Sequence, residues 1–287
     1  MSATQVQVGS LLRDWRRRRR LSQLDLALDA DVSARHLSFV ETGRSRPSAT
    51  MVLHLAERLE VPLRERNQLL LAGGYAPVYS QAALDAPEMS EVRAAVRQVL
   101  TGHEPYPAAA VDRHWNLVEA NSGIALMTAD VDGELLEAPP NAMRLALHPG
   151  GLAPRIANLG EWRAHLLSRL RRQVALTADP VLAELLDEVR AYPCDDDEPD
   201  VEIPAVGEVF VPLRLRHGDG ELAFFSTVTT FGTPLDVTVA ELAIESFFPA
   251  DEATSAALRG RATCWLADFP VGCDLKGEGQ RSSPGPK

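Results

Sequence analysis

Residues 22–47 constrain the fold more than any other stretch, because they combine two short amphipathic segments with a tight polar turn. The polar run 29–33 forms the turn, and the flanking apolar residues fall at helical spacing. These apolar residues are Leu24, Ala27 and Leu28 before the turn, and Leu37 and Val40 after it. Two short helices joined in this way place the second helix in the major groove of DNA. The stretch therefore predicts a helix-turn-helix that reads DNA.

Helix signals on both sides extend this unit to an all-α head of five helices within residues 1–73. Hydroxyl and carboxylate side chains at a helix start satisfy the first free backbone amides, and Ser22 with Asp25 has the spacing of a capping box. The residues expected to begin or end the helices are Val8, Arg20, Ser22, Ser33, Gly43, Ser48 and Pro62.

Charge is distributed unevenly along the 287 residues, whose formal net charge is −11. Residues 1–75 contain 12 Lys and Arg against 8 Asp and Glu, a net of +4. The other 212 residues contain 17 basic and 32 acidic side chains, a net of −15. A basic head attracts phosphate, whereas an acidic body repels it and favours solubility. The asymmetry supports DNA binding by the head.

Eight residues are predicted to contact double-stranded DNA: Gln23, Ser33, Ala34, Arg35, Ser38, Phe39, Arg44 and Arg46. Arg35, near the start of the third helix, suits two hydrogen bonds to guanine O6 and N7. Ala34 and Phe39 suit contacts with thymine methyl groups. Gln23 and Ser33 lie at helix N-termini, where backbone amides meet phosphate. The two arginines that follow the helix are expected to bind the DNA backbone.

Five consecutive arginines occupy residues 16–20. A run of this length on a helix points in every direction, so at least one side chain is expected to face inward. For the others, phosphate contact and a solvated helix face are equally good interpretations.

Residues 9–72 resemble the XRE (Cro/C1-type) helix-turn-helix family, whose fold is lambda-repressor-like. The residues that carry the resemblance are Leu21, Ser22, Gln23, Leu26, Ala27, Val32, Ser33, Leu37, Glu41, Gly43 and Pro47. The resemblance implies that Gln23 contacts phosphate and that Arg16 pairs with Glu41. It also implies base-reading positions for the three residues matched above to guanine and thymine. Asp31 stands where the family usually has glycine, and aspartate tolerates a left-handed backbone better than most residues.

Beyond the head, the pattern predicts a linker and connecting helix over residues 74–106 and an α+β domain over 107–262. A tail is expected over 263–287, disordered from about residue 277 because it is rich in Gly, Pro and Ser. Strands are expected at 108–111, 115–119, 209–216, 221–231 and 237–248, and helices at 158–176, 180–192 and 251–259. An antiparallel sheet with helices on one side gives a PAS-like domain that curves around a cavity of ligand size.

Two stretches of this domain resemble MmyB-like regulators, which combine an XRE head with a PAS-like ligand-binding domain. They are residues 144–158, RLALHPGGLAPRIAN, and residues 111–121, VDRHWNLVEAN. The resemblance spans about residues 9–260. It implies a small apolar, fatty-acid-like ligand that is bound without a covalent bond.

Six residues are candidates for contact with this ligand: Trp115, Met127, Arg144, His148, Arg155 and Phe224. Arg144 and Arg155 are the candidates for binding a carboxylate, although each also fits a surface or interdomain salt bridge. The apolar candidates also fit a plain hydrophobic core. His148 fits a loop better than a haem ligand.

Other chemistry is not indicated. The three cysteines lack metal-ligand or disulfide spacing, which favours a reducing cytoplasm. We find no signal peptide, membrane span, phosphate-binding loop or nucleophile elbow, so neither a membrane partner, an enzyme nor a cofactor is expected.

The sequence therefore predicts a bacterial, nucleoid-associated transcription regulator that binds DNA as a homodimer and responds to an apolar ligand. One alternative is a DNA-binding regulator whose second domain serves only for dimerisation or contact with a partner protein. The other is an enzyme with a DNA-binding appendage.

Overall fold

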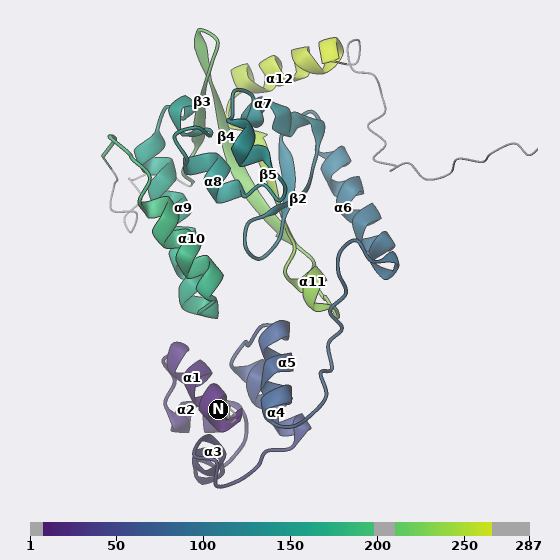
Figure 1. The fold of residues 1–287 in the computed structure, drawn as a ribbon, viewed down its shortest axis with the longest axis vertical. Helices are drawn as coiled ribbons and strands as arrows, with labels where there is room; N and C mark the ends of the chain where they lie inside the picture. Colours follow the sequence, from purple (N-terminus) through teal and green to yellow (C-terminus); the bar gives the residue numbers. More distant parts are fainter. Residues whose placement is uncertain (1–7, 198–209, 266–287) are drawn as a thin grey trace, which may run out of the picture.

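The computed structural model describes residues 8–197 and 210–265, which form two domains stacked along the long axis of the molecule (Figure 1). The head contains five α-helices within residues 8–75, as predicted. They are α1 (Val8–Arg18), α2 (Gln23–Asp29), α3 (Ala34–Glu41), α4 (Ala49–Arg58) and α5 (Leu63–Ala72).

The predicted helix caps of the head are confirmed. The Ser22 hydroxyl accepts a hydrogen bond from the Asp25 amide, and the Asp25 carboxylate accepts one from the Ser22 amide, which completes the capping box. Ser33 and Ser48 likewise cap α3 and α4. Asp31 has a φ of 50°, so the turn between α2 and α3 has the left-handed backbone that was expected.

The predicted inner face of α2 is partly wrong. Leu24 and Leu28 have 59% and 73% of their surface exposed, whereas Leu26, Ala27 and Ala30 are buried. Because α2 has only seven residues, apolar side chains at helical spacing fit two different faces. The tertiary contacts with α1 and α3 select the second of these faces for the core of the head.

The C-terminal domain contains a five-stranded antiparallel sheet with the order β2-β1-β5-β4-β3. Its strands are β1 (Ala108–Val111), β2 (Leu117–Ala120), β3 (Leu213–His217), β4 (Gly220–Thr230) and β5 (Ala243–Pro249). Its α-helices are α6 (Ser90–Gly102), α7 (Ala125–Thr128), α8 (Ala142–Leu147), α9 (Leu159–Thr177), α10 (Pro180–Arg190), α11 (Val237–Ala240) and α12 (Glu252–Trp265). Short 3₁₀ helices are η1 (Pro87–Met89), η2 (Ser122–Ile124), η3 (Gly133–Leu136) and η4 (Ala153–Arg155). This is the expected α+β, PAS-like architecture.

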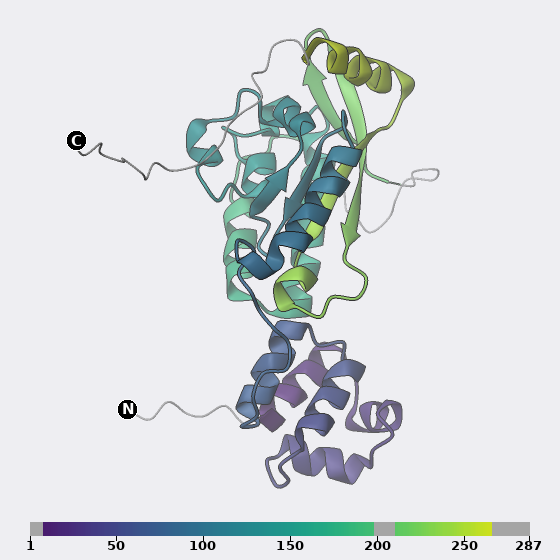
Figure 2. The ribbon, with the colours of Figure 1, turned by 90° about the vertical axis from the view of Figure 1, so that its right-hand side faces the viewer.

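Helices cover both faces of the sheet, not one face as the sequence suggested. Side chains alternate along β1, so Ala108 and Ala110 pack in one cluster with Val96 and Leu100 of α6. The intervening residues of β1 face α7, α8 and α9 on the other side, where they line a pocket. Figure 2 shows α6 lying across the sheet. A connecting helix was expected here, but its role as one layer of the domain was not.

Three further expectations need correction. Residues 237–240 form the short helix α11 because Asp236 caps them, so the last strand begins only at Ala243. The spacing of Asn158 and Glu161 also predicts a capping box, but the Asn158 amide instead donates to the Glu161 side chain and the Pro212 carbonyl and accepts from the Arg214 amide. Helix α8, capped by Asn141, was missed. The last helix extends to Trp265, beyond the expected end, and the predicted disorder from residue 277 lies outside the described residues.

Helices α9 and α10 pack against each other beside the pocket face of the sheet. Helix α9 has 19 residues and carries several arginines along its length. Within the described residues, no helix combines the length and the apolar character needed to cross a membrane.

Candidate DNA-reading surface and ligand pocket

The predicted base-reading residues lie on α3, at the end of the molecule far from the C-terminal domain (Figure 1). Arg35 is exposed, and Ala34, Ser38 and Phe39 are half-buried. The Cζ atoms of Arg35 and Arg44 lie 5.4 and 6.0 Å from the centroid of the Phe39 ring. Two guanidinium groups therefore flank one aromatic ring, which orients positive charge on this surface.

The other predicted DNA contacts are already engaged within the head. The Ser33 hydroxyl caps α3. Arg46 is exposed, yet its guanidinium donates two hydrogen bonds to the Gly73 carbonyl at the end of α5. Gln23 Nε2 donates to Glu41 Oε2 over 2.8 Å. An amide nitrogen has two protons, so Gln23 keeps a second one for another acceptor.

Arg16 and Glu41 form the ion pair that the family resemblance implied. Arg16 Nε and Nη2 donate to the two carboxylate oxygens over 2.6 and 2.8 Å, and its Nη1 donates to the Leu21 carbonyl. Only 1% of the Glu41 side chain is exposed. Burial raises the pKa of Glu41, but the bonds from Arg16 and Gln23 outweigh it and hold that pKa below its ordinary value. This pair ties α1 to α3 behind the DNA-reading face.

A pocket lies between the sheet and helices α7, α8 and α9. Its volume is about 740 Å³ when the open space at its mouth is included. Its lining consists of Ala109, Val111, Trp115, Leu117, Ile124, Met127, Thr128, Val131, Ala142, Met143, Leu145, Ala146, Leu152, Trp162, Leu166, Leu213, Glu245 and Phe247. An apolar hollow with few polar groups is typical of a small-molecule site.

Trp115 is held in place at this pocket by its backbone and its ring. Its φ of 69° is left-handed, a conformation that bulky side chains rarely adopt. The indole Nε1 donates to Gln173 Oε1 over 2.8 Å, and the Cζ of Arg169 lies 4.8 Å from the ring centroid. Contacts from α9 thus fix a strained residue in the pocket wall.

Only two of the six predicted ligand residues, Trp115 and Met127, line the pocket. Arg144 instead forms two 2.7 Å hydrogen bonds with Glu188, and Arg155 donates to the carbonyls of Leu126 and Ala129. Phe224 is fully buried in the neighbouring core. Arg144 therefore lies in a salt bridge and Phe224 in the hydrophobic core, the alternative interpretations given for these residues above.

His148 also lies outside the pocket lining. Its Nδ1 accepts a hydrogen bond from the Gly150 amide, and its ring meets that of Tyr192 edge-on, 4.9 Å between centroids. Tyr192 donates to Glu188, and burial together with this bond raises the pKa of Tyr192 to about 12. The loop interpretation of His148 fits these contacts.

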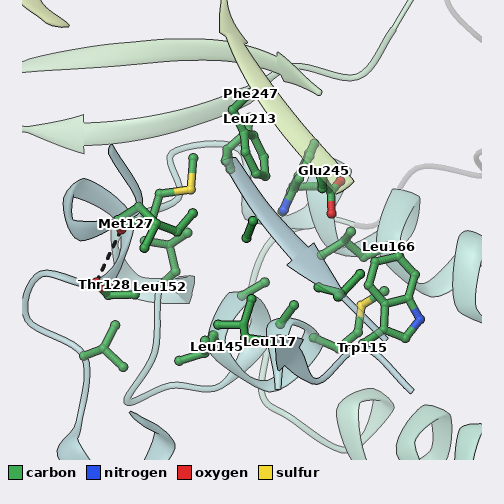
Figure 3. Close-up of a pocket in the computed structure, with 18 residues that line it drawn as sticks. Trp115, Leu117, Met127, Thr128, Leu145, Leu152, Leu166, Leu213, Glu245 and Phe247 are labelled. Carbon is green, nitrogen blue, oxygen red and sulfur yellow. Dashed lines mark hydrogen bonds between the residues drawn. The ribbon is translucent and has the colours of Figure 1, made fainter. Parts of the chain in front are cut away.

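Sequence reasoning missed Glu245, which lines the pocket from β5 (Figure 3). Its Oε1 accepts a hydrogen bond of 2.8 Å from Arg169 Nη1, and 8% of the residue is exposed. A carboxylate inside the apolar run 243–249 was the signal available in the sequence.

A charge cluster joins the head to the C-terminal domain. Arg64 of α5 donates to both oxygens of Glu241 over 2.7 Å, so its pKa is raised. Arg113, in the turn between β1 and β2, lies 3.8 Å from Glu241 and 3.3 Å from Asp179. His114 contacts the same Asp179 carboxylate at 3.0 Å. The two domains thus meet through charged side chains that neighbour the pocket in sequence.

The linker is attached to both domains. Asn67 of α5 accepts hydrogen bonds from the amides of Val78 and Tyr79. Asp236, which caps α11, accepts from the Ser80 hydroxyl and the Ala82 amide. The predicted linker therefore has a defined path between the domains.

A helix-turn-helix head followed by a domain with an apolar pocket is the architecture of transcription regulators that carry a ligand-binding domain. Comparison with protein families agrees with this class. Residues 92–260 match the family described as MmyB-like transcription regulator ligand binding domain, and residues 12–66 match the family described as Helix-turn-helix. The chain belongs to the MmyB-like transcription regulators. The predicted resemblance and fold class are confirmed.

Comparison with individual proteins adds little. No curated protein matches the chain. One similar solved structure is described as "Structure of an RNA-binding Light-Oxygen-Voltage Receptor"; it shares 15% sequence identity and has a TM-score of 0.26. The similarity covers 91% of this chain, which spans 64% of the length of that protein.

Proposed function

We propose that this regulator binds a two-fold symmetric DNA operator as a homodimer, and that a small apolar, fatty-acid-like molecule in the pocket changes this binding. Helix α3 would lie in the major groove, with half-sites about 34 Å apart, one turn of DNA. The observation that carries the ligand proposal is the pocket itself, whose 18 lining residues contain two side chains with oxygen atoms, Thr128 and Glu245.

The contacts between the domains suggest how the pocket could influence the head. Trp115 lines the pocket and follows directly after Arg113 and His114, which belong to the interdomain charge cluster. Glu245 lines the pocket four residues after Glu241, the partner of Arg64. A ligand that favours one arrangement of these segments shifts the head by no more than its differential affinity for the two arrangements.

Native mass spectrometry of the full chain as purified tests two parts of the proposal, the homodimer and the bound apolar ligand. A parallel denatured sample releases and identifies any bound molecule. A dimer that carries one apolar molecule per chain is the expected result. An empty monomer, still empty and monomeric with short apolar compounds, would contradict the proposal.

The dimerisation module remains the second candidate for the C-terminal domain. It would be favoured if the phenylalanine side chains filled the cavity, but Phe224 packs in the core and Phe247 is the one phenylalanine among the lining residues of the described pocket. A dimer that takes up no apolar compound would favour this candidate. No observation in the described residues favours the enzyme alternative.

A further inference from the structure

The pocket has an unusual charge composition for a site expected to take fatty-acid-like molecules. Its described lining contains no Lys, Arg or His, and its one ionisable side chain is the carboxylate of Glu245. Figure 3 shows this carboxylate among apolar side chains. Thr128 lies on another side of the pocket, beside Met127. A charged head group placed inside this pocket would therefore have an acidic side chain, and no basic one, among the lining residues.

Arg169 neutralises Glu245 from behind the pocket wall. Its Nη1 donates to Glu245 Oε1 over 2.8 Å, and its guanidinium lies over the Trp115 ring. In the sheet, Glu245 pairs with Ala109 on one side and Val228 on the other, so its backbone is fixed at the centre. The guanidinium is thus placed to balance one carboxylate, and Glu245 supplies it.

No second positive charge near neutral pH comes from His165, one turn before Arg169 on α9. Burial and the charge of Arg169 lower the pKa of His165, although Glu245 opposes this. A ligand carboxylate would therefore be buried beside Glu245 with one guanidinium shared between the two anions. Burial of an unbalanced charge is strongly unfavourable.

We propose that the Glu245–Arg169 pair selects an apolar ligand whose head group is an uncharged hydrogen-bond donor, such as a hydroxyl, and rejects the ionised carboxylate. This selection rests on the proposed apolar-ligand function of the pocket. A hydroxyl donates its proton to the Glu245 carboxylate and leaves the charge balance of the pair intact. Glu245 and Arg169 are specificity-determining residues in this assignment.

Isothermal titration calorimetry of the full chain at pH 8 with 1-decanol and sodium decanoate tests the selection. Any apolar pocket prefers the uncharged alcohol, so the decisive quantity is how a Glu245→Gln substitution changes the ratio of the two dissociation constants. The substitution removes the acidic charge and leaves the positive charge of Arg169 uncompensated beside the pocket. We expect the preference for decanol to fall by at least about tenfold. The control Glu119→Gln makes the same change in a carboxylate outside the pocket lining, which pairs with Arg97, and should leave the ratio unchanged.

A measurement on the unmodified chain supports the test in case the variant does not fold. Decylammonium, with the same chain length, should bind more tightly than decanoate, because Glu245 attracts a cation and repels an anion. Decanoate binding as tightly as decanol or decylammonium would overturn the selection while the apolar-ligand function stands. An unchanged ratio in a folded Glu245→Gln variant would overturn it too. If none of the three compounds binds, the proposed ligand function itself fails.

Discussion

Each domain contains an arginine–glutamate ion pair whose glutamate is buried, and the two pairs differ in what surrounds them. In the head, Glu41 accepts three hydrogen bonds from Arg16 and Gln23 between closely packed helices. In the C-terminal domain, Glu245 accepts one from Arg169, and its carboxylate also faces an apolar hollow. The same two side-chain types thus hold helices together in one place and border a binding site in the other.

This difference shows that the chemistry of a buried pair depends on the space beside it. A carboxylate whose hydrogen-bonding capacity is used by the protein stabilises the fold and offers a ligand little. A carboxylate beside a cavity can still accept a proton donor from outside the protein. The comparison predicts that substitutions in the head pair act on stability, whereas those in the pocket pair act on ligand choice.

The largest effect is expected for Glu41→Ala. The substitution leaves the Arg16 guanidinium buried and unpaired, a loss of about 3–5 kcal/mol of unfolding free energy. Urea denaturation followed by circular dichroism should show the head unfolding first, with the C-terminal transition unchanged. Asp29→Ala, at an exposed position of α2, is the control and should change little. A single unaltered transition in Glu41→Ala would contradict the role of the pair.

The pH dependence of the same pair has a defined sign. The pKa of Glu41 is lowered from its ordinary 4.5, so its contribution to head stability is fully present above that value. The contribution should disappear as the pH falls through the lowered pKa. Denaturation of the parent chain and Glu41→Ala from pH 7 to pH 3 should therefore converge at the acidic end.

A second comparison adds methyl groups at two places, the closely packed contact between α1 and α3 and the lining of the pocket. A Cβ on Gly9 would lie 2.1 Å from the Val40 carbonyl oxygen, so Gly9→Ala must move α1 away from α3. We expect a loss of about 1–3 kcal/mol in the head. Ala146→Val adds methyl groups to the pocket lining and should reduce decanol binding with a smaller loss of stability. Equal stability losses would contradict the contrast between the regions.

The DNA-reading surface should respond in binding rather than in stability. Arg35 is exposed on α3, so Arg35→Ala should cost about 1–3 kcal/mol of binding free energy at one base pair and relax specificity there. Arg44→Ala should weaken binding to all sequences alike. Affinities for a selected operator and its single-base variants, measured at fixed salt, distinguish the two. Uniform weakening by Arg35→Ala would refute its base-reading role.

The head was predictable from local signals. Ser22, Ser33 and Ser48 indicate helix starts, because each hydroxyl can accept a hydrogen bond from the amide three residues later, and the structure contains all three hydrogen bonds. The face of α2 was not predictable, because Leu24 and Leu28 are as well spaced as Leu26 and Ala30. Only the partners supplied by α1 and α3 decide between them.

The pocket was less predictable because its walls come from distant parts of the chain. Trp115 and Met127 were identified from their type, but Glu245 and Arg169 are 76 residues apart and meet only through the sheet and α9. Arg144 was predicted to bind a ligand carboxylate because its actual partner, Glu188, lies 44 residues away on α10 and could not be identified from the sequence. Sequence gives the charge of such side chains, and the fold decides what balances it.

The smallest effect on stability is expected where the two regions meet. Arg64 and Glu241 are partly exposed, so separating them by Glu241→Gln should cost no more than about 1 kcal/mol. Its effect on the coupling between the ligand pocket and the head should be larger, because α11 leads into the strand that carries Glu245. The quantity to measure is the change in operator affinity that 1-decanol causes, in the parent chain, Arg64→Gln, Glu241→Gln and the double variant.

If the pair transmits the ligand's effect, each single substitution removes most of that change, and the double variant adds nothing further. Glu119→Gln, which removes an ion pair with Arg97 away from the head, is the matched control and should leave the response intact. A contact that only held the domains together would shift stability and leave the decanol response unchanged. That outcome would assign the coupling to the hydrogen bond from Arg18 of α1 to the Thr177 carbonyl or to the linker held by Asp236, since these are further described connections between the regions.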